Sequence, residues 1–376
     1  MKVLLIKIFK LCLNIVYCFF KLFRTRKQIT FISRQSNTPS ADFKLLSDEL
    51  IKELPDYKVV LLCKTMDNKI AYPFNMLKQM YHLSRSKVVI IDSYSILVSN
   101  LKHKKSLKVV QIWHALGLMK RAGYAILGLE EGRNEKTSIA LNMHKNYDFV
   151  FTTSKNCIES MSQVFGCNQG IIHSVPLPRI DLLRDRKNIK HIQDGIYKLY
   201  PTLKDKKNIL YAPTFRGNDG VLESALKELI ELFDFEKYNL IVKLHPLSNI
   251  NIDNKNVIVA REFSTVEMMM VSDTVISDYS SIIYEAGILK KDQIFYAFDL
   301  DKYKGARDFF IDYEKELPGP ICKTAKKVMT YIKKKDYTDY KGDNLISRYV
   351  DLKVKNCTKN MTEKIKLILD GSTLDD

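Results

Sequence analysis

The spacing of hydrophobic and polar residues changes after the first 26 residues of the chain. From Gln28 onward, short apolar runs alternate with amphipathic stretches of helix length. Runs rich in Val, Ile and aromatic residues, separated by helical segments, are typical of parallel β-sheets whose strands are connected by helices. We predict strands at Ile29–Ile32, Lys58–Leu62, Lys87–Ile91, Lys108–Ile112, Phe149–Thr152, Ile209–Ala212, Asn239–Lys243, Val257–Ala260, Thr274–Ser277 and Gln293–Ala297.

These strands fall into two groups, one on either side of the polar stretch Arg184–Lys207. Since they are too many for one compact doubly wound sheet, we predict an α/β protein with two Rossmann-like domains that face each other across a cleft. Folds of this class bind ligands at the carboxyl ends of their strands. The expected segments are an amphipathic helix at 1–26, Rossmann-like domains at 27–195 and 196–335, and C-terminal helices at 336–376 that pack back on the first domain.

The first 26 residues predict an amphipathic helix that lies at a membrane surface. The apolar run between Lys10 and Lys21 is about ten residues long, whereas a bilayer needs roughly 20, and no small-residue cleavage site of a secretory signal follows it. A core helix or an uncleaved signal anchor would show a similar pattern. We expect the Lys side chains to contact anionic headgroups on the cytoplasmic side while the apolar residues enter the acyl boundary. The polar face holds Lys7, Lys10, Asn14 and Lys21, and the apolar surface includes Phe19 and Phe20.

The composition of the chain limits the classes of binding partner that we expect. The 376 residues are 46% hydrophobic and 27% charged, which is typical of a globular protein. A net charge of +17 indicates a polyanionic partner, which can be nucleic acid, anionic lipid or a phosphate-bearing substrate, although a genome rich in Lys codons would also raise it. The basic residues form no Arg-rich arm and no zinc-finger spacing is present, so we expect no nucleic acid partner. The seven scattered cysteines form no C-x-x-C pair, which predicts neither a zinc site nor a disulfide framework.

Known cofactor motifs are also absent from the sequence. No G-x-G-x-x-G and no Walker A sequence is present, which argues against a dinucleotide oxidoreductase or a P-loop kinase. We expect no required cofactor and no metal.

The first polar cluster follows the predicted strand at Lys108–Ile112. The segment VVQIWHALGLMKR runs from that strand into the single Trp of the chain, Trp113, and then into His114. A His at the carboxyl end of a strand can act as a general base near neutral pH. It can also be a packed loop residue. Further along, Gly117, Lys120 and Arg121 are candidate contacts for an acceptor or a phosphate.

Two further clusters end the first and second strands of the second group. In ILYAPTFR, the strand stops at Pro213, Thr214 offers a neutral donor, and Arg216 offers a planar fork suited to phosphate oxygens. In IVKLHP, strand alternation places Lys243 and His245 on one face, where they could stabilise a departing phosphate. A solvated Arg at an ordinary strand exit is the plainer explanation for the first of these clusters.

The fourth cluster is the segment VISDYSSIIYE. The strand ends at Ser277, and Ser280 and Ser281 stand where the next helix should begin. Free backbone N–H groups, the positive end of the helix dipole and two hydroxyls could together hold an anion. These serines could equally be N-caps, and Glu285 could be the solvated partner of Lys290. Since all four clusters follow strands, together they indicate transfer chemistry on a phosphorylated substrate.

In these segments the sequence resembles the CDP-glycerol glycerophosphotransferase family of teichoic acid and capsule synthesis. The resemblance covers roughly Lys108 to Thr324, and the motifs keep the order and spacing of the family. It is carried by VVQIWHALGLMKRAG, VPLPRID, ILYAPTFR, IVKLHP, ISDYSSIIYEAGIL and QIFYAFDLDKYKGARDFFIDYEKELPGPI.

The resemblance implies the glycosyltransferase-B fold, with an acceptor-binding first domain and a donor-binding second domain. It implies CDP-glycerol or CDP-ribitol as donor, a lipid-linked saccharide or polymer as acceptor, and a peripheral place on the cytoplasmic face of the bacterial membrane. The two essential histidines of the family fall on His114 and His245. The donor-binding residues that we expect are Arg179, of the P-R-x-D motif, with Pro213, Thr214, Arg216, Lys243, Ser280, Ser281 and Glu285. In length the chain resembles the short primase type, which adds one or a few units.

Two departures concern the acceptor. The W-H motif of the family is often followed by Gly-Thr or Asn-Gly, whereas here Ala115, Leu116 and Gly117 follow. The stretch between Gly123 and Asn146 also matches less well. We expect these differences to affect the choice of acceptor or polyol.

The expected reaction is attack of an acceptor hydroxyl on the β-phosphorus of CDP-glycerol, with loss of CMP. His114 would take the hydroxyl proton, and His245 would stabilise charge at phosphorus together with Lys243 and Arg216. The Ser280–Ser281 segment would hold the pyrophosphate, and Glu285 would contact the ribose. The alternatives are a CDP-ribitol ribitolphosphotransferase, a nucleotide-sugar glycosyltransferase of the same fold, and a basic protein that binds membranes or nucleic acid without catalysis.

Overall fold

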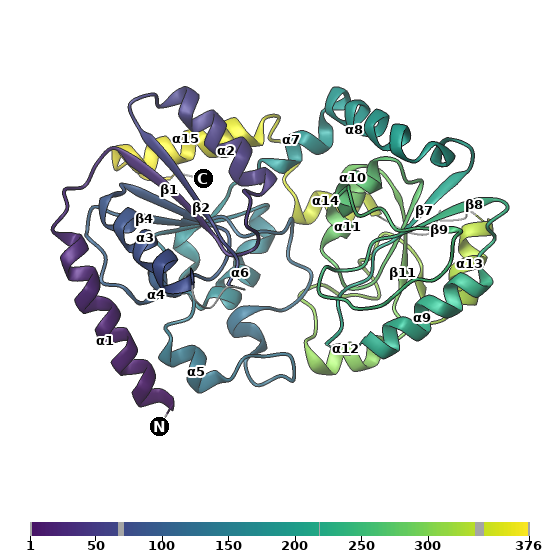
Figure 1. Cartoon of the computed structure of the whole chain (residues 1–376), viewed down its shortest axis with the longest axis horizontal. Helices are drawn as coiled ribbons and strands as arrows, with labels where there is room; N and C mark the ends of the chain where they lie inside the picture. The colour runs from purple at the N-terminus through teal and green to yellow at the C-terminus, as the bar shows by residue number, and fades with distance from the viewer. Residues whose placement is uncertain (1, 67–70, 218, 335–341, 375–376) are drawn as a thin grey trace. The chain divides into compact units, whose positions relative to one another are not determined.

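The chain forms two compact units, each built around one parallel β-sheet. The computed structural model describes residues 2–66, 71–217, 219–334 and 342–374. The first unit contains Met1–Asp181 together with Asp351–Asp376, and the second contains Leu182–Val350 (Figure 1). Each sheet has six strands, and every strand pair in both sheets is parallel.

The sheet of the first unit has the strand order β2-β1-β3-β4-β5-β6. Two of its inner strands, β1 and β3, are buried at every position, because helices cover both faces of a parallel sheet. The strands are β1 Gln28–Ser33, β2 Lys58–Cys63, β3 Val88–Ile91, β4 Lys108–Gln111, β5 Phe149–Thr152 and β6 Ile172–Ser174.

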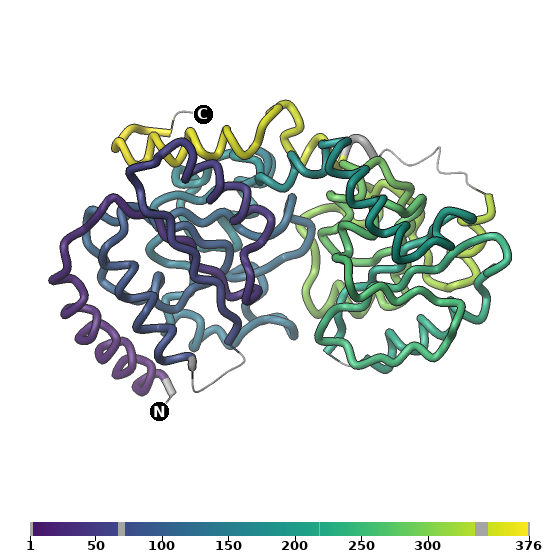
Figure 2. The backbone as a smooth tube through the Cα atoms, turned by 45° about the horizontal axis from the view of Figure 1, so that its top comes forward, coloured from purple at the N-terminus to yellow at the C-terminus, as the bar shows by residue number. Residues whose placement is uncertain are grey.

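Helices connect these strands, and the last helix of the chain joins the same unit. The C-terminal helix α15 packs beside α2, as Figures 1 and 2 both show. Lys366 on α15 lies 3.6 Å from the carboxylate of Glu53 on α2. The helices are α1 Lys2–Lys21, α2 Ala41–Glu53, α3 Ala71–Arg85, α4 Ile96–Asn100, α5 Glu135–Ala140, α6 Ile158–Phe165, α7 Arg179–Arg184 and α15 Cys357–Asp370, with 3₁₀ turns η1 Gly123–Ile126, η2 Lys155–Cys157 and η3 Gln169–Ile171.

The sheet of the second unit has the strand order β12-β11-β10-β7-β8-β9. Its strands are β7 Lys207–Tyr211, β8 Tyr238–Val242, β9 Val257–Ile258, β10 Thr274–Ser277, β11 Asp292–Tyr296 and β12 Ile321–Cys322. Its helices are α8 Arg186–Leu199, α9 Asp219–Leu232, α10 Thr265–Met270, α11 Ile282–Ile288, α12 Leu300–Ala306, α13 Ala325–Lys334 and α14 Gly342–Tyr349, with the 3₁₀ turn η4 Pro201–Lys204.

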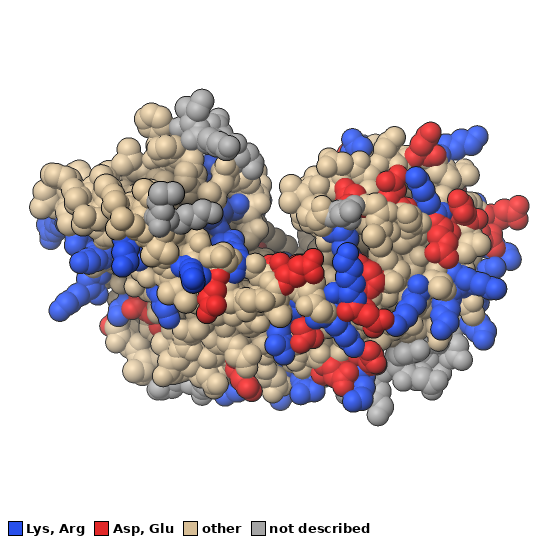
Figure 3. Space-filling model, turned by 90° about the horizontal axis from the view of Figure 1, so that it is seen from below, with Lys and Arg blue, Asp and Glu red and all other residues tan. Residues whose placement is uncertain are grey.

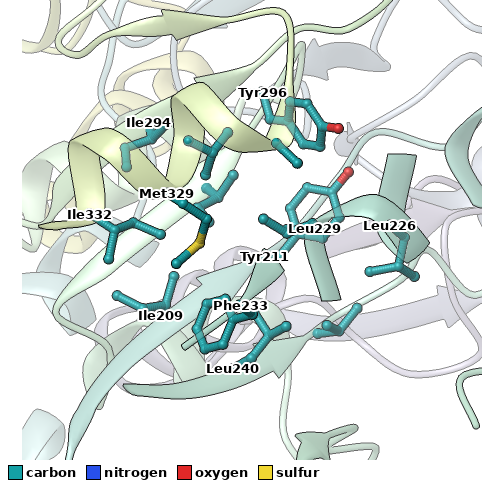
Figure 4. Packing of buried hydrophobic residues seen from close by; sticks show 14 of the residues in the cluster. Ile209, Tyr211, Leu226, Leu229, Phe233, Leu240, Ile294, Tyr296, Met329 and Ile332 are labelled. Carbon is teal, nitrogen blue, oxygen red and sulfur yellow. The ribbon is translucent and has the colours of Figure 1, made fainter. Parts of the chain in front are cut away.

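Alternate residues of these strands enter two separate cores. Ile209 and Tyr211 of β7 pack with the apolar faces of α9 and α13, whereas Leu210 between them packs with residues of α8 and α10 on the other side of the sheet (Figure 4). Successive side chains of a strand point to opposite faces, so a strand covered on both sides must be apolar at every position. This requirement explains the apolar runs Ile209–Tyr211 of β7 and Leu240–Val242 of β8.

All ten predicted strands are present; β5 and β10 have the predicted bounds, and the ends of the others differ by at most two residues. The sequence did not indicate β6 and β12, which are edge strands of three and two residues. Runs this short carry too little periodicity to be recognised. The seven cysteines are all free.

The division of the chain differs from the expected boundaries at 195 and 336. The helix α8 belongs to the second unit, where it packs on α10 and where Gln193 donates to the Met270 carbonyl (2.7 Å). The segment expected at 336–376 is also split: α14 packs on α11 of the second unit, whereas α15 packs on α2 of the first. Residues 335–341 lie outside the described residues.

The amino-terminal helix α1 lies within the helix expected at 1–26, and its apolar part is longer than the run counted between Lys10 and Lys21. It is continuous over Lys2–Lys21, and by length and composition alone the part at Val3–Lys21 could cross a membrane, a test that core helices and signal sequences also pass. The expectation of a run too short to span was therefore wrong, because it counted only the residues between two lysines. Most of the apolar side chains are exposed: Leu4, Leu5, Ile8, Leu11, Ile15 and Phe19.

Part of the polar side of α1 contacts the rest of the first unit. Lys10 donates to the Ala140 carbonyl (2.9 Å), and Asn14 donates to the Asn100 carbonyl (3.0 Å). Tyr17 is fully buried on the same side. Lys7 remains exposed, Lys21 and Phe20 are half-buried, and Phe19 is exposed.

Candidate functional site

The turn after β4 places His114 at the carboxyl edge of the first sheet. The buried Gln111 side chain ends the strand and accepts a hydrogen bond from the Trp113 amide (2.8 Å). Trp113 has a φ of 59°, a left-handed conformation that is strained for a bulky residue. Its ring lies against the imidazole of His114, with centroids 4.2 Å apart, and against Phe165. The strained turn therefore holds an exposed His beside an aromatic wall.

One hydrogen bond fixes the tautomer of His114. Its Nδ1 lies 3.0 Å from the carbonyl oxygen of Asp92, the residue that follows β3. A carbonyl oxygen can only accept, so Nδ1 carries the proton and Nε2 keeps its lone pair. This is the form of imidazole that a general base requires.

The surroundings of His114 favour its neutral form. Desolvation by the surrounding protein lowers the pKa of His114, and the positive charges of Arg179 and Lys120 lower it further. The hydrogen bond to Asp92 and the charge of Asp42 act in the opposite direction. A lowered pKa leaves the imidazole deprotonated at neutral pH.

Arg179 supports the backbone of His114. It is the first residue of α7, and its side chain forms an ion pair with Asp42, which is 1% exposed on α2. The Arg179 amide and Nε both donate to Asp42 (2.8 and 2.7 Å), and Nη2 donates to the His114 carbonyl (3.1 Å). The residue expected to bind the donor thus lies in the first unit and holds the His114 turn in place.

The candidate acceptor residues lie in the same turn. Gly117 adopts a left-handed φ of 59°, and its amide donates to the Thr153 hydroxyl (3.0 Å). Lys120 and Arg121 are both half-buried. These residues follow His114 along one loop of the first unit.

In the second unit, Arg216 is the centre of a buried ionic network. Its Nη2 lies 2.8 Å from Asp278 Oδ2, and its Nε lies 2.9 Å from Asp299 Oδ2. Nη2 also donates to Asp299 Oδ1 (3.0 Å), and Nη1 donates to the Thr214 carbonyl (2.7 Å). These acceptors occupy most of the five N–H donors of an arginine. The guanidinium expected to hold phosphate oxygens therefore ties together the residues that follow β7, β10 and β11.

Electrostatics of this network favour the charged states. Burial alone would lower the pKa of Arg216, but the carboxylates of Asp278 and Asp299 outweigh it and raise that pKa. Burial would raise the pKa of Asp299, yet the hydrogen bond and charge of Arg216 lower it, with help from the Tyr279 hydroxyl. The guanidinium also lies over the Tyr279 ring, 5.0 Å from its centroid.

Pro213 and Thr214 form the start of the same loop. Pro213 is buried, and the Thr214 amide donates to Asp278 Oδ1 (2.8 Å). The Thr214 hydroxyl is buried without a hydrogen-bond partner among the described residues. It is therefore a polar group that a ligand could satisfy.

His245 has the opposite tautomer to His114. The Leu247 amide donates to its Nδ1 (3.2 Å), so Nδ1 accepts and the ring proton lies on Nε2. The imidazole is exposed and lies beside Phe215, with centroids 5.4 Å apart. The Nε2–H group of His245 can therefore donate a hydrogen bond.

Lys243 lies close to His245 in the sequence but points to the backbone. Its ammonium donates to the carbonyls of Ala260 and Phe263, the latter at 2.6 Å. Burial lowers the pKa of Lys243, while Glu262 and Glu267 act to raise it. The lysine holds the chain that follows β9 against the end of β8.

A cavity of about 480 Å³ opens at this end of the second sheet. Its volume lies within the usual range of small-molecule sites. Arg261, which the sequence reasoning did not single out, is exposed and lines the cavity. The polar lining consists of Lys243, His245, Ser248, Asn251 and Arg261.

The Ser280–Ser281 segment precedes α11 as predicted. Ser280 accepts a hydrogen bond from the Ile282 amide (3.4 Å), whereas the Ser281 side chain makes no capping hydrogen bond. Both serines are half-buried. Glu285 is 4% exposed, so it is not the solvated surface residue of the plainer interpretation.

Three carboxylates with structural roles were missed by the sequence reasoning. Asp42 holds Arg179, and Asp278 with Asp299 holds Arg216. Asp278 and Asp299 each follow a strand closely, which is a signal that could have been used. Asp42 carries no such signal, because it meets Arg179 across 137 positions of the chain.

The network gives a test of whether Arg216 is structural. Replacing Arg216 with Ala leaves the fully buried Asp278 carboxylate without its ion partner, which should lower the free energy of unfolding by about 3–5 kcal/mol. The measurement is a urea unfolding curve.

The matched control is Lys227→Ala. Its ion pair with Glu223 on α9 (2.9 Å) is exposed to solvent, so the change should cost only about 0–1 kcal/mol. Equal stability of the Arg216→Ala and Lys227→Ala proteins would contradict a structural role for Arg216.

Comparison with known proteins places these units in a family. Residues 15–368 match the family model described as CDP-Glycerol:Poly(glycerophosphate) glycerophosphotransferase. The chain is 30% identical over 365 residues to the teichoic acid poly(ribitol-phosphate) polymerase of Bacillus spizizenii, covering 93% of this chain and 58% of the relative. It is 32% identical over 272 residues to the teichoic acid glycerol-phosphate primase of Bacillus subtilis, covering 69% of this chain and 68% of the relative.

The fold has a solved counterpart. The structure of the wall teichoic acid polymerase TagF aligns with a TM-score of 0.77 at 23% identity, covering 96% of this chain and 94% of that chain. The residues that the sequence singled out lie within the matched range, apart from Lys7, Lys10 and Asn14 of α1. The chain belongs to the CDP-glycerol:poly(glycerophosphate) glycerophosphotransferase family.

Proposed function

We propose that the chain transfers a polyol phosphate from a CDP-activated polyol to a hydroxyl group of a lipid-linked saccharide or polymer, with release of CMP. The chain spans little more than half of the length of the Bacillus spizizenii polymerase. The activity of this chain is therefore proposed from its own site and is not taken over from that relative. The proposal includes the expected glycosyltransferase-B arrangement, in which two Rossmann-like domains bind the two substrates.

The main observation behind this proposal is that His114 and His245 have opposite tautomers. His114 holds its proton on Nδ1 and offers the Nε2 lone pair, while His245 accepts at Nδ1 and offers Nε2–H. A base for the attacking hydroxyl and a donor for a phosphate oxygen are the two groups that such a transfer needs.

In the proposed step, the acceptor oxygen forms a bond to the β-phosphorus of the donor while the bond from that phosphorus to the oxygen of CMP breaks. The hydroxyl proton passes to Nε2 of His114, and the electron pair of the broken bond leaves with CMP. His245 donates to a phosphate oxygen and stabilises the developing charge. Positioning and charge stabilisation suffice for such a transfer, so the step has no covalent enzyme intermediate.

The second unit supplies the proposed donor site. Its cavity carries Lys243, His245 and Arg261, whose positive charges and N–H groups suit a diphosphate. Ser280 and Ser281 would contact the pyrophosphate, and Glu285 the ribose. In this proposal Arg216 shapes the loop that carries Thr214, because its N–H groups are held by Asp278 and Asp299.

The membrane placement rests on α1. Its apolar side is exposed, and its middle is tied to the first unit by Lys10 and Asn14. A helix crossing the bilayer would lose these hydrogen bonds to the first unit and carry the charge of Lys10 into hydrocarbon, where a charged side chain is costly. A helix lying flat at the interface avoids that cost, so we place the protein peripherally on the cytoplasmic face of the bacterial membrane.

A ribitol donor is the second candidate. The Bacillus spizizenii polymerase is named for ribitol phosphate, and the Bacillus subtilis primase for glycerol phosphate, at similar identity to this chain. Both polyols carry the same CDP group, so the proposed roles of the two histidines are unchanged.

Loss of either histidine should stop the transfer. His114→Ala and His245→Ala should each lower the rate of CMP release by roughly 10²–10⁴-fold, as removal of a general base or a charge-stabilising donor does in other enzymes. The control is His191→Ala, on the exposed side of α8, which should retain the wild-type rate. Near-normal rates for both alanine variants would overturn the assignment.

The dependence of the rate on pH should report His114. The base must be neutral, and its pKa is lowered, so the rate should stay high as the pH falls and drop only below the usual histidine value of about 6.5. Lys120→Gln removes a nearby positive charge, which stabilises the imidazolium, raises its pKa and moves this acid limb to higher pH. A profile of kcat/KM against pH for both proteins measures the shift, and an unmoved limb would argue against His114 as the titrating group.

The donor can be identified by the mass of the product. The protein is incubated with CDP-glycerol or CDP-ribitol and a short-chain lipid-linked disaccharide, and the products are weighed by mass spectrometry. We expect CMP and an acceptor heavier by one or a few polyol phosphate units. Transfer of a sugar from a nucleotide-sugar donor, with no reaction of either CDP-polyol, would reject the proposal.

A further inference from the structure

A second cavity, of about 670 Å³, opens in the first unit beside α1. Its lining includes Leu107 and Val109 at the beginning of β4 and Asp148 just before β5. Because the strands are parallel, this is the amino-terminal edge of the sheet, opposite to the edge that carries His114. The cavity is therefore separate from the proposed catalytic residues.

The charge of the lining is strongly positive. Four lysines line the cavity, and its single carboxylate, Asp148, is already used: it accepts from the Val109 amide (2.8 Å) and lies 3.6 Å from the Lys108 ammonium. Lys102 and Lys105 are exposed and form no ion pair with any acid in the described ranges. The four lysines are Lys10, Lys102, Lys104 and Lys105.

Burial and neighbouring positive charges both lower the pKa of two of these lysines. Burial lowers the pKa of Lys10, and the neighbouring Lys7 lowers it further. Burial likewise lowers the pKa of Lys104, with Arg85 and Lys21 adding to the effect. An anion in the cavity would relieve this repulsion.

The wall that α1 contributes is held in place and has an apolar rim. Asn14 donates to the Asn100 carbonyl (3.0 Å) and accepts from the Lys102 amide (2.8 Å), which fixes the segment of the lysines to α1. Leu11, on the same helix, also lines the cavity and is 61% exposed. Basic groups thus meet an exposed apolar surface at one opening. Figure 3 shows Lys and Arg side chains gathered beside an area of other residues on the first unit, at the left of the view.

We propose that this cavity binds the phosphate headgroup of an anionic membrane lipid, with the acyl chains along the exposed apolar side of α1. The inference rests on the membrane placement proposed above and adds a specific site to it. Ammonium groups suit a phosphate, and lysines at a membrane surface each add attraction to anionic lipid. The apolar rim at Leu11 distinguishes the site from one for soluble phosphate, because a soluble anion gains nothing from an exposed leucine.

Binding to lipid vesicles distinguishes the proposed membrane placement of α1 from the proposed headgroup site in the cavity. The full chain is sedimented with vesicles of phosphatidylcholine alone and of phosphatidylcholine mixed with phosphatidylglycerol. Binding to the neutral vesicles reports the placement of α1, and the gain on adding phosphatidylglycerol reports the cavity. We expect Lys102→Ala/Lys105→Ala to bind neutral vesicles as the wild type does and to lose about tenfold or more of the affinity for the mixed vesicles.

A soluble lipid then tests the site itself, free of general surface attraction. Calorimetric titration with monomeric dihexanoyl phosphatidylglycerol should show saturable binding to the wild type and to the charge-matched control Lys255→Ala/Lys326→Ala, whose lysines are exposed on the second unit. The Lys102→Ala/Lys105→Ala protein should not bind, and dihexanoyl phosphatidylcholine should not bind to any of them.

Three results would overturn the inference. Wild-type affinity of Lys102→Ala/Lys105→Ala for the soluble lipid would show that the cavity is not the site. Binding of inorganic phosphate as tight as that of the lipid would identify a general anion site. Failure of the wild type to bind any vesicle would reject both the site and the membrane placement, whereas loss of the phosphatidylglycerol gain alone would reject only the site.

Discussion

Parallel pairing of all the strands is the constraint on which the rest of the structure depends. It places the carboxyl ends of β3 and β4 at one edge of the first sheet, and those of β7, β8, β10 and β11 at one edge of the second. Residues far apart in the sequence meet there: Asp92 with His114, and Asp278 with Arg216. Parallel strands also require crossover helices on both faces, so most strand positions are apolar and most polar groups stand near the strand ends. The chemistry is confined to these ends for that reason.

Buried ion pairs hold both strand ends in shape. Asp42 and Arg179 fix the turn of His114, and Asp278 with Asp299 surrounds Arg216 in the second unit. Such pairs add little net stability, because desolvation of the charges offsets much of their attraction. Loss of one partner, however, strongly lowers the free energy of unfolding. Their value here is geometric: each arginine joins loops from separate elements through several N–H groups. The strained Trp113 turn can persist because neighbouring contacts hold it.

The first helix reverses the usual orientation of an amphipathic helix. In a surface helix of a soluble protein the apolar side faces the core, whereas in α1 Lys10 and Asn14 contact the first unit and Leu11 and Phe19 are exposed. An exposed apolar surface of this kind marks a site of interaction with a membrane or another molecule. The basic cavity on its protein-facing side then provides positive charge close to that apolar surface. Catalysis and membrane attachment would thus use opposite edges of one sheet.

The sequence by itself determined the architecture of the two sheets and the position of the motifs. Short apolar runs rich in Val and Ile, such as that of β3, are typical of strands buried on both faces, and ten of the twelve strands were predicted from this local pattern. His114 and His245 were found because each directly follows such a run. The family resemblance rested on these same segments. It was confirmed by a family model that matches residues 15–368.

The tertiary structure alone decided what each polar group does. The pattern could not show that Arg216 is held by Asp299 or that Lys243 binds backbone carbonyls, because these partners are 83 and 17–20 residues away. It could not give the tautomers of the two histidines, since each depends on one hydrogen bond formed by the folded backbone. Nor could it show which side of α1 is exposed, because helical periodicity fixes the two faces but not the surface that each one meets. Periodicity is a local property, whereas ion pairs, tautomers and exposure arise from contacts across the fold.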